Sequence, residues 1–201
     1  MQILNMKLLS DIEKKIPIFL NLGGGNEYIS GYYNVDYASL EYVDVIADLN
    51  EPLDKIPDDS VSGIYSNNTF EHISNLIMLL SEIHRICING AHCKIIVPHF
   101  ANPYYYSDFT HVRQFGLFSM HYFVGPDQQW RRKVPEYYSS IKFKIIDVKL
   151  TFYKDSWFDH IITPIMHFLV NKSRLTQHFF ERRLCWVFPP AHITYVIEIV
   201  K

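Results

Sequence analysis

The sequence predicts an α/β fold with an open, mostly parallel sheet, and three observations carry that prediction. Three consecutive glycines, Gly23 to Gly25, directly follow a short apolar run at 18–22. A second short run, at 32–36, ends on the acid Asp36. Farther along, apolar runs of strand length alternate with a segment of helical periodicity, which favours parallel strands joined by right-handed crossovers.

The glycine-rich stretch predicts a ligand site at the carboxyl end of the first long strand. Glycine lets the backbone turn sharply there and lets a ligand approach it closely. An acid at the end of the next strand, Asp36 in this chain, can accept hydrogen bonds from a ribose diol. We therefore expect a nucleoside-bearing ligand; the alternative is a tight turn between two core strands.

The spacing of this stretch argues against a dinucleotide. The dinucleotide fingerprint needs a third small residue where this chain has Tyr28. It also opens a helix that binds pyrophosphate, with the acid roughly 20 residues farther on. Asp36 follows Gly25 by only 11 residues. S-adenosylmethionine contains no phosphate, so it tolerates the loss of that helix.

The other elements are predicted from periodicity and turn signals. Residues 2–15 indicate a short amphipathic helix, and apolar residues from Ile73 to Cys87 recur with helical spacing before the stop signal Asn89-Gly90. Residues 156–187 are expected to be mostly helical. The predicted strands are 17–22, 32–36, 43–47, 61–66, 93–97, 141–150 and 193–200.

Composition limits the classes of function. The 201 residues, 48% hydrophobic and 20% charged, fit one ordinary globular domain. A net charge of −2 argues against nucleic acid as the main partner. Three cysteines do not make a disulfide framework or a zinc cluster. No signal peptide and no apolar run of about 18 residues is visible, so we expect a cytoplasmic protein.

Four stretches together resemble one protein family. They are LNLGGGNEYISGYYNVD, DVIADLNEPLDKIPDDSVSGIYSNNTFEHI, the segment ending KIIVPHF, and SDFTHVRQF, covering roughly residues 17–125. In combination they resemble class I S-adenosylmethionine-dependent methyltransferases, type 11-like, specifically the small bacterial branch found among polysaccharide-biosynthesis genes. The terminal ERRLCWVFPPAHITYVIEIV resembles the same branch.

The resemblance implies a Rossmann-like fold with an open seven-stranded, mostly parallel sheet and helices on both faces. The antiparallel last strand would be inserted beside the sixth. One methyltransferase domain would span residues 1–201, with an acceptor or lid insertion at 99–135 and a helical segment at 151–190. The implied activity is S-adenosylmethionine-dependent methylation of a small hydroxyl acceptor, a sugar in surface-glycan biosynthesis.

The resemblance also assigns cofactor contacts by position. Gly23, Gly24 and Gly25 would cradle the methionyl and ribose part. Asp36 would bind the ribose hydroxyls, and Asp48 would bind the adenine amino group with the Leu49 backbone beside it. Asn67 would lie near the methionyl group.

Two features depart from the family pattern. Asn21 occupies the place of an acid two residues before the first glycine. Its amide can still accept a hydrogen bond from the cofactor ammonium, but it carries no negative charge. The crossover after Gly25 is shorter than the dozen or so residues that a parallel connection normally needs. That shortening is common in the small branch and predicts a more open cofactor pocket.

The stretch after the strand at 93–97 supplies candidates for the acceptor side. Methyl transfer is a direct displacement, and a hydroxyl acceptor also needs its proton removed, for which a His or a carboxylate is suited. We expect His111 to be the general base, oriented by Asp108, with Arg113 binding an anionic group of the acceptor. His99 and Tyr106 are further candidates for acceptor binding.

Each candidate on the acceptor side has a plain alternative. Asp108 and Thr110 would cap a helix that begins near His111, and His99 would satisfy a loop. A metal site from His99, Asp108 and His111 matches no standard spacing, so no metal is expected. Glu71, next to His72, is explained by the dipole of a helix N-terminus.

Two apolar groups have more than one interpretation. The apolar helix at 156–170, followed by basic residues, could pack over the sheet, form a dimer interface or rest on a membrane. Eight aromatic residues would form either a lid or a second small core: Tyr104, Tyr105, Tyr106, Phe109, Phe115, Phe118, Tyr122 and Phe123.

Two other functions fit the same sequence features. The protein could be a catalytically silent binding module with this fold, or a methyltransferase for another small molecule or a lipid.

Overall fold

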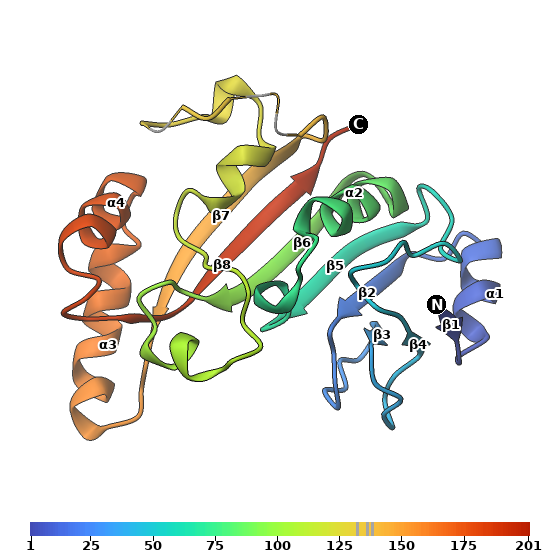
Figure 1. Ribbon diagram of the computed structural model, residues 1–201, viewed down its shortest axis with the longest axis horizontal. Coiled ribbons are helices and arrows are strands. Elements are labelled where there is room, and N and C mark those ends of the chain that lie inside the picture. The colour runs from blue at the N-terminus through green and yellow to red at the C-terminus, as the bar shows by residue number, and fades with distance from the viewer. Residues whose placement is uncertain (132, 136, 138) are drawn as a thin grey trace.

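One eight-stranded sheet forms the centre of the computed structural model, which describes residues 1–131, 133–135, 137 and 139–201 (Figure 1). The strand order is β1-β4-β3-β2-β5-β6-β8-β7. Residue 132, within the expected insertion at 99–135, lies outside the described residues. The strands are β1 (Gln2–Ile3), β2 (Ile18–Leu22), β3 (Tyr33–Asp36), β4 (Val45–Ile46), β5 (Val61–Asn67), β6 (Cys87–Pro98), β7 (Phe143–Phe152) and β8 (Pro190–Ile199).

The sheet has the predicted open, mostly parallel topology. Strands β4, β3, β2, β5 and β6 pair in parallel, whereas the last strand, β8, lies between β6 and β7 and is antiparallel to both. Because β2 pairs with β3 on one side and with β5 on the other, the strand order reverses at β2. In open α/β sheets, ligands bind outside the carboxyl ends of the strands at such a point.

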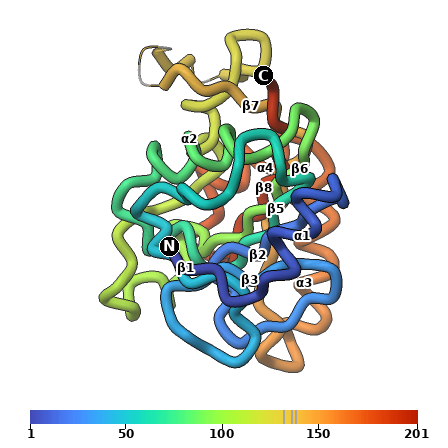
Figure 2. Tube along the Cα trace, turned by 90° about the vertical axis from the view of Figure 1, so that its right-hand side faces the viewer, coloured from blue at the N-terminus to red at the C-terminus, as the bar shows by residue number. Residues whose placement is uncertain are grey.

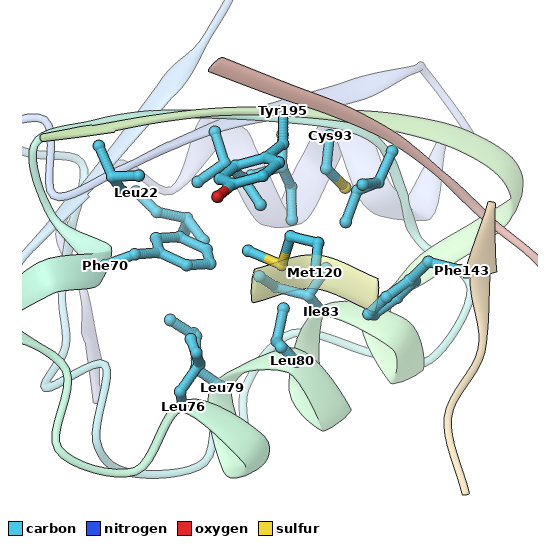
Figure 3. Packing of buried hydrophobic residues seen from close by; sticks show 14 of the residues in the cluster. Leu22, Phe70, Leu76, Leu79, Leu80, Ile83, Cys93, Met120, Phe143 and Tyr195 are labelled. Atoms are coloured by element: carbon cyan, nitrogen blue, oxygen red, sulfur yellow. The ribbon is translucent and has the colours of Figure 1, made fainter. Parts of the chain in front are cut away.

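Helix α2 (Leu76–Ile86) covers one face of the sheet through a continuous apolar side. Figure 3 shows Leu79, Leu80 and Ile83 of this helix pointing toward Cys93 and Tyr195 of β6 and β8. All five of these side chains are fully buried, and each leucine or isoleucine contributes roughly 1.5–3 kcal/mol through burial. This packing fixes α2 against the middle of β6 and against β8.

The remaining helices lie toward the edges of the sheet. Helix α1 (Lys7–Glu13) packs beside β2, close to the β1–β4 edge that faces the viewer in Figure 2. Helices α3 (Trp157–Val170) and α4 (Arg174–Arg183) lie beside β7 at the opposite edge (Figure 1). In the described part of the chain, none of the helices combines the length and the apolar character needed to cross a membrane.

Two predicted helix boundaries are wrong. The helix expected at 2–15 begins only at Lys7, because Gln2 and Ile3 pair with β4 and add an eighth strand at the edge. Helix α2 ends at Ile86 rather than at Asn89-Gly90, because Cys87 already pairs with Val61 of β5. Gly90 has a φ of +80° and lies in the irregular first part of β6.

The two crossovers that follow β2 and β3 are short. Residues 23–32 and 37–44, all of them described, contain no helix. On the sheet face opposite α2, His92 and Lys94 of β6 are exposed. The short crossover that the sequence predicts after Gly25 is therefore confirmed, and no crossover helix at 23–32 covers the glycine turn at the carboxyl end of β2.

The segment between β6 and β7 has little regular structure. Its described residues include the short 3-10 helices η2 (Pro103–Ser107), η3 (Ser119–Phe123) and η4 (Pro126–Gln128). Another, η1 (Phe70–His72), follows β5. η1 and η2 follow the carboxyl ends of β5 and β6, whereas Gln128 of η4 pairs with Ile145 near the start of β7, toward the opposite end of these strands.

Candidate functional site

The glycine turn after β2 is locked to the segment after β5 by direct packing. Gly23 has a φ of +69°, and a Cβ at this position would lie 2.1 Å from Oγ1 of Thr69. The same Thr69 hydroxyl donates a hydrogen bond to the Leu22 carbonyl at 3.2 Å. A side chain at position 23 would therefore push the two strand ends apart.

Gly25 and Asp36 form a polar pair at the open side of this turn. The Gly25 N–H donates to Oδ2 of Asp36 at 2.8 Å, and the Ala38 N–H donates to Oδ1 at 2.9 Å. A Cβ on Gly25 would meet no atom within 4 Å. The carboxylate is thus held in a fixed orientation at the end of β3, and each oxygen keeps a lone pair for a further donor.

The other predicted cofactor residues follow neighbouring strands. Asp48 comes two residues after β4, where its Oδ1 accepts from the Asn50 N–H at 2.8 Å and its side chain is exposed. The side chain of Leu49 is buried, so only its backbone could face a ligand. Asn67 ends β5 and is half-buried. Because β3 and β4 are parallel neighbours, Asp36 and Asp48 follow the same edge of the sheet.

The Asn21 side chain makes its hydrogen bond inside the glycine turn rather than facing the ligand side. Its side-chain amide donates to Oδ1 of Asn34 at 2.9 Å, and both residues are buried. A Cβ on Gly24 would lie 2.6 Å from this amide nitrogen. The amide that replaces the family's acid therefore joins β2 to β3 and packs directly beneath Gly24.

Glu71 is buried beside the glycine turn, and its carboxylate accepts no hydrogen bond from the described residues. Its side chain is 0% exposed, and neither carboxylate oxygen has a hydrogen-bond partner among the described residues. Burial raises the pKa of Glu71 to about 7. Its Oε1 lies 4.0 Å from Nε2 of His111.

His111 is held in one tautomer by a backbone carbonyl. Its Nδ1 lies 2.9 Å from the Tyr105 carbonyl oxygen, which can only accept, so Nδ1 carries the proton. In the neutral ring, Nε2 therefore has the free lone pair. This nitrogen lies 3.6 Å from Oδ2 of Asp108 as well as near Glu71.

His72 is connected to Asp108 through a hydroxyl. The Thr110 hydroxyl donates to Oδ1 of Asp108 at 2.6 Å and lies 2.9 Å from Nδ1 of His72. A hydroxyl has one proton, so Thr110 accepts from His72, and Nδ1 of His72 is protonated. Hydrogen bonds from Thr110 lower the pKa of Asp108. The His72 and His111 rings meet edge to face with centroids 4.8 Å apart.

The alternative in which Asp108 and Thr110 cap a helix at His111 is wrong. Residues 108–118, all described, contain no helix, and Asp108 instead accepts from the Thr110 N–H at 2.9 Å within its own turn. That turn directs His111 toward Glu71. The Asp108-x-Thr110-His111 motif therefore shapes a polar cluster rather than a helix start.

Two of the three residues expected to bind the acceptor, Arg113 and Tyr106, donate hydrogen bonds to backbone carbonyls of the protein. Arg113 donates from Nε to the Ile73 carbonyl at 2.6 Å and also to the Ser74 carbonyl. The Tyr106 hydroxyl donates to the Phe100 carbonyl at 2.8 Å. The Arg113 contacts hold the segment after β6 against the residues that precede α2, and the Tyr106 contact lies within that segment.

His99, the third of these residues, lies in the protein interior rather than in the expected acceptor pocket. It is fully buried, its Nε2 lies 3.2 Å from Oε1 of Glu181, and its Nδ1 accepts from the Ala101 N–H at 3.1 Å. With both ring nitrogens occupied, His99 satisfies a loop, as the alternative interpretation predicts. It pairs with helix α4 rather than with Asp108 and His111.

The aromatic residues divide between a core and an exposed rim. Tyr105, Phe115 and Phe123 are buried, whereas Phe109, next to Asp108, is 96% exposed. Phe115 and Phe123 belong to the main hydrophobic core of the sheet, so they do not form the separate small core that the sequence suggested. Phe109 leaves an aromatic face open beside the polar cluster.

Short backbone links connect the polar cluster to the glycine turn. The Glu71 carbonyl accepts from the N–H groups of Val112 and Arg113 at 2.8 and 3.1 Å. Two residues before Glu71, Thr69 packs against Gly23. The glycine turn, η1 and the loop that carries His111 therefore form one continuous site at the carboxyl edge of the sheet.

The sequence interpretation missed Glu71. It assigned this acid to the dipole of a helix, but α2 begins only at Leu76, and η1 is a single 3-10 turn. A signal was present: Glu71 and His72 lie four and five residues after the end of β5, and β5 is the parallel neighbour of β2, which ends at the glycines. Only the return of the chain at residues 108–113 shows that the carboxylate is buried.

Solved structures share this fold at low sequence identity. A SAM-dependent methyltransferase from Archaeoglobus fulgidus matches with 16% identity and a TM-score of 0.53, covering 96% of this chain and 90% of its own. One from Mesorhizobium loti matches with 13% identity and a TM-score of 0.52, covering 94% and 96%. The [4+2]-cyclase SpnF matches with 9% identity and a TM-score of 0.52, covering 96% and 80%. No family model and no curated protein matches the chain.

The chain therefore has the Rossmann-like fold of class I S-adenosylmethionine-dependent methyltransferases. The cyclase among its neighbours illustrates that this fold does not fix the reaction. Function has to be argued from the residues of the site.

Proposed function

We propose that the protein is an S-adenosylmethionine-dependent methyltransferase that acts on a small hydroxyl acceptor. The observation that carries the proposal is the junction at Thr69, which joins the Gly25–Asp36 pair to the Glu71–His111 cluster. A cofactor site and an acceptor site that share one short segment can place two reactants in contact. Positioning of this kind supplies much of the rate in a direct displacement.

The glycine turn fits the cofactor in its chemistry. The backbone of Gly23 to Gly25 would approach the methionyl and ribose part, and Asp36, already oriented by two N–H donors, would accept from the ribose hydroxyls. Asp48 and the Leu49 backbone would contact the adenine, with Asn67 near the methionyl group. When bound, S-adenosylmethionine supplies a methyl group on a positively charged sulfur, ready for attack by a nucleophile.

The polar cluster would prepare the acceptor. In transfer to a hydroxyl, the methyl group moves from sulfur to oxygen and the hydroxyl proton must be taken up. We assign that proton to Nε2 of His111, whose lone pair is set by the Tyr105 carbonyl. The carboxylate of Asp108 stabilises the charged imidazole that results, as an anion near a histidine does.

A sugar is the acceptor class that we favour. The exposed ring of Phe109 offers an aromatic face beside the cluster, and such faces stack on sugar rings. The role in surface-glycan biosynthesis rests on the sequence resemblance alone. Another small molecule or a lipid with a hydroxyl group would use the same cluster.

Calorimetric titration with S-adenosylmethionine, followed by methyl-incorporation assays, tests the proposal. We expect saturable binding, and methyl transfer to at least one member of a panel of nucleotide sugars and glycan fragments. The absence of binding at high micromolar cofactor would favour a catalytically silent module with the same fold. Binding without transfer to any sugar, but with transfer to another hydroxyl compound, would correct the acceptor class only.

A further inference from the structure

We propose that Glu71, His72 and His111 bind a divalent transition-metal cation, with Zn²⁺ the best match. One ligand atom from each residue lies within 4.8 Å of those of the other two. The inference goes beyond the proposed function, because cation binding can be measured whether or not methyl transfer occurs. It departs from the sequence analysis, which considered only the set of His99, Asp108 and His111 and expected no metal; His99 is paired with Glu181 instead.

The unpartnered carboxylate of Glu71 is the first argument for a cation. The side chain is fully buried, and both oxygens lack a hydrogen-bond donor among the described residues. A buried polar group without a partner costs free energy, and buried charges are normally paired or coordinate metals. The guanidinium of Arg113, two residues after His111, donates instead to the carbonyls of Ile73 and Ser74. A bound cation would supply the missing partner.

The tautomers of the two histidines are the second argument. His111 donates from Nδ1 to the Tyr105 carbonyl, and His72 donates from Nδ1 to the Thr110 hydroxyl. In both neutral rings, Nε2 therefore carries the lone pair. Histidines that bind metals usually donate their other ring N–H to a carbonyl, carboxylate or water, which fixes the ring orientation. Both rings already have this arrangement.

The chemistry of the ligands selects the kind of cation. Two imidazole nitrogens and one carboxylate oxygen suit Zn²⁺ and its transition-metal neighbours, whereas Mg²⁺ and Ca²⁺ prefer oxygen ligands. Three protein ligands leave a coordination position open, as in catalytic zinc sites. Asp108, with Oδ2 3.6 Å from Nε2 of His111, lies at the rim of the site.

The cation would change how the acceptor loses its proton. A hydroxyl bound to a divalent cation has a lowered pKa, so it releases its proton to solvent without a base. Nε2 of His111 would then be a metal ligand, whereas in the cation-free protein it is the proton acceptor. Activity with and without the cation distinguishes these two states of the same residue.

Calorimetry on the full chain, stripped with EDTA and titrated with Zn²⁺, tests the site. We expect one equivalent to bind, with Mg²⁺ binding at least about tenfold more weakly. Glu71→Gln and His111→Gln should each weaken Zn²⁺ binding at least about tenfold, and Thr110→Val, which breaks the His72 contact, by roughly 10-fold. His92→Gln is the matched control, because His92 is an exposed imidazole 3.4 Å from Glu198, and it should leave binding unchanged.

Unfolding of each variant in EDTA separates loss of ligands from loss of fold. Glu71→Gln removes a buried carboxylate that accepts no hydrogen bond from the described residues, so this variant should melt no lower than the wild-type chain without metal. No saturable binding below about 1 mM Zn²⁺, or equal weakening by Glu71→Gln and His92→Gln, would overturn the proposal. Titration with S-adenosylmethionine in EDTA tests the cofactor site separately, so the two proposals can fail independently.

Discussion

The carboxylate of Glu71 faces Nε2 of His111 across 4.0 Å with no hydrogen bond of its own among the described residues. The two residues come from different segments, η1 after β5 and the irregular loop after β6. The backbone of Glu71 binds that same loop through Val112 and Arg113. The acceptor side of the site is therefore built on a contact between two loops.

His111→Ala should abolish most methyl transfer and leave cofactor binding intact. Loss of a positioned general base typically lowers the rate about 10²–10⁴-fold. The glycine turn does not contact the imidazole, so the affinity for S-adenosylmethionine should change by less than about twofold. Rates of methyl incorporation and calorimetry provide the two measurements, with His92→Ala as the control. An unchanged rate would leave a mechanism that depends on positioning alone.

Gly23→Ala should destabilise the protein more than Gly25→Ala. Both glycines have positive φ, which costs a side chain roughly 1–2 kcal/mol, but only at Gly23 would the new Cβ collide with Thr69. Overpacking of this kind costs about 1–3 kcal/mol in addition. Urea unfolding gives both free energies.

Adding Thr69→Ala to the Gly23→Ala variant provides a check on the cause. Removal of the threonine side chain should recover part of the loss, giving a favourable coupling between the two changes. Equal destabilisation by Gly23→Ala and Gly25→Ala would show that the contact with Thr69 is not responsible.

Asp36→Asn should weaken binding of S-adenosylmethionine by roughly 10–100-fold. The carboxylate accepts from the Gly25 and Ala38 N–H groups, and an amide has only one acceptor oxygen. Hydrogen bonds to a charged group contribute about 1.5–3 kcal/mol each, and 1.4 kcal/mol is about tenfold in affinity. Calorimetric titration measures the change, with the exposed Asp54→Asn as the control. Wild-type affinity in Asp36→Asn would remove this residue from the cofactor site.

Glu82 should make stability depend on pH below about 4.5. Hydrogen bonds from Arg85 and Leu53 lower its pKa in the folded protein. Its stabilising effect is therefore present above the pKa of the unfolded chain, about 4.3, and is lost as the pH falls through the lower folded value. Glu82→Gln should cost about 1–3 kcal/mol at pH 7.

Urea unfolding from pH 7 to pH 3 tests this dependence. The wild-type chain and Glu82→Gln should converge in stability as the pH falls, because both then lack the charge at position 82. Glu51→Gln, at an exposed acid of the neighbouring loop, should keep the wild-type dependence. A constant difference between the first two proteins at all pH values would contradict the assignment.

Much of the fold was predictable from local patterns in the sequence. Short apolar runs located β2, β3, β5 and β8 to within a few residues, and the spacing from Leu76 to Ile83 located α2. The glycines and Asp36 gave the ligand edge, because a turn and an acid after consecutive strands are signals that a short window contains. The edge strand at Gln2–Ile3 was missed because two residues become a strand only through their partner, β4.

The sequence by itself determined the order of the main strands and helices from β2 onward, the glycine turn and the types of side chain near it, since these depend on spacing along a few residues. Tertiary structure alone decided that Glu71 is buried opposite His111, that His99 pairs with Glu181, and that Asn21 donates a hydrogen bond to Asn34. The reason is physical: burial and the pKa of a carboxyl group depend on which distant segments exclude water from it, and no local pattern carries that information.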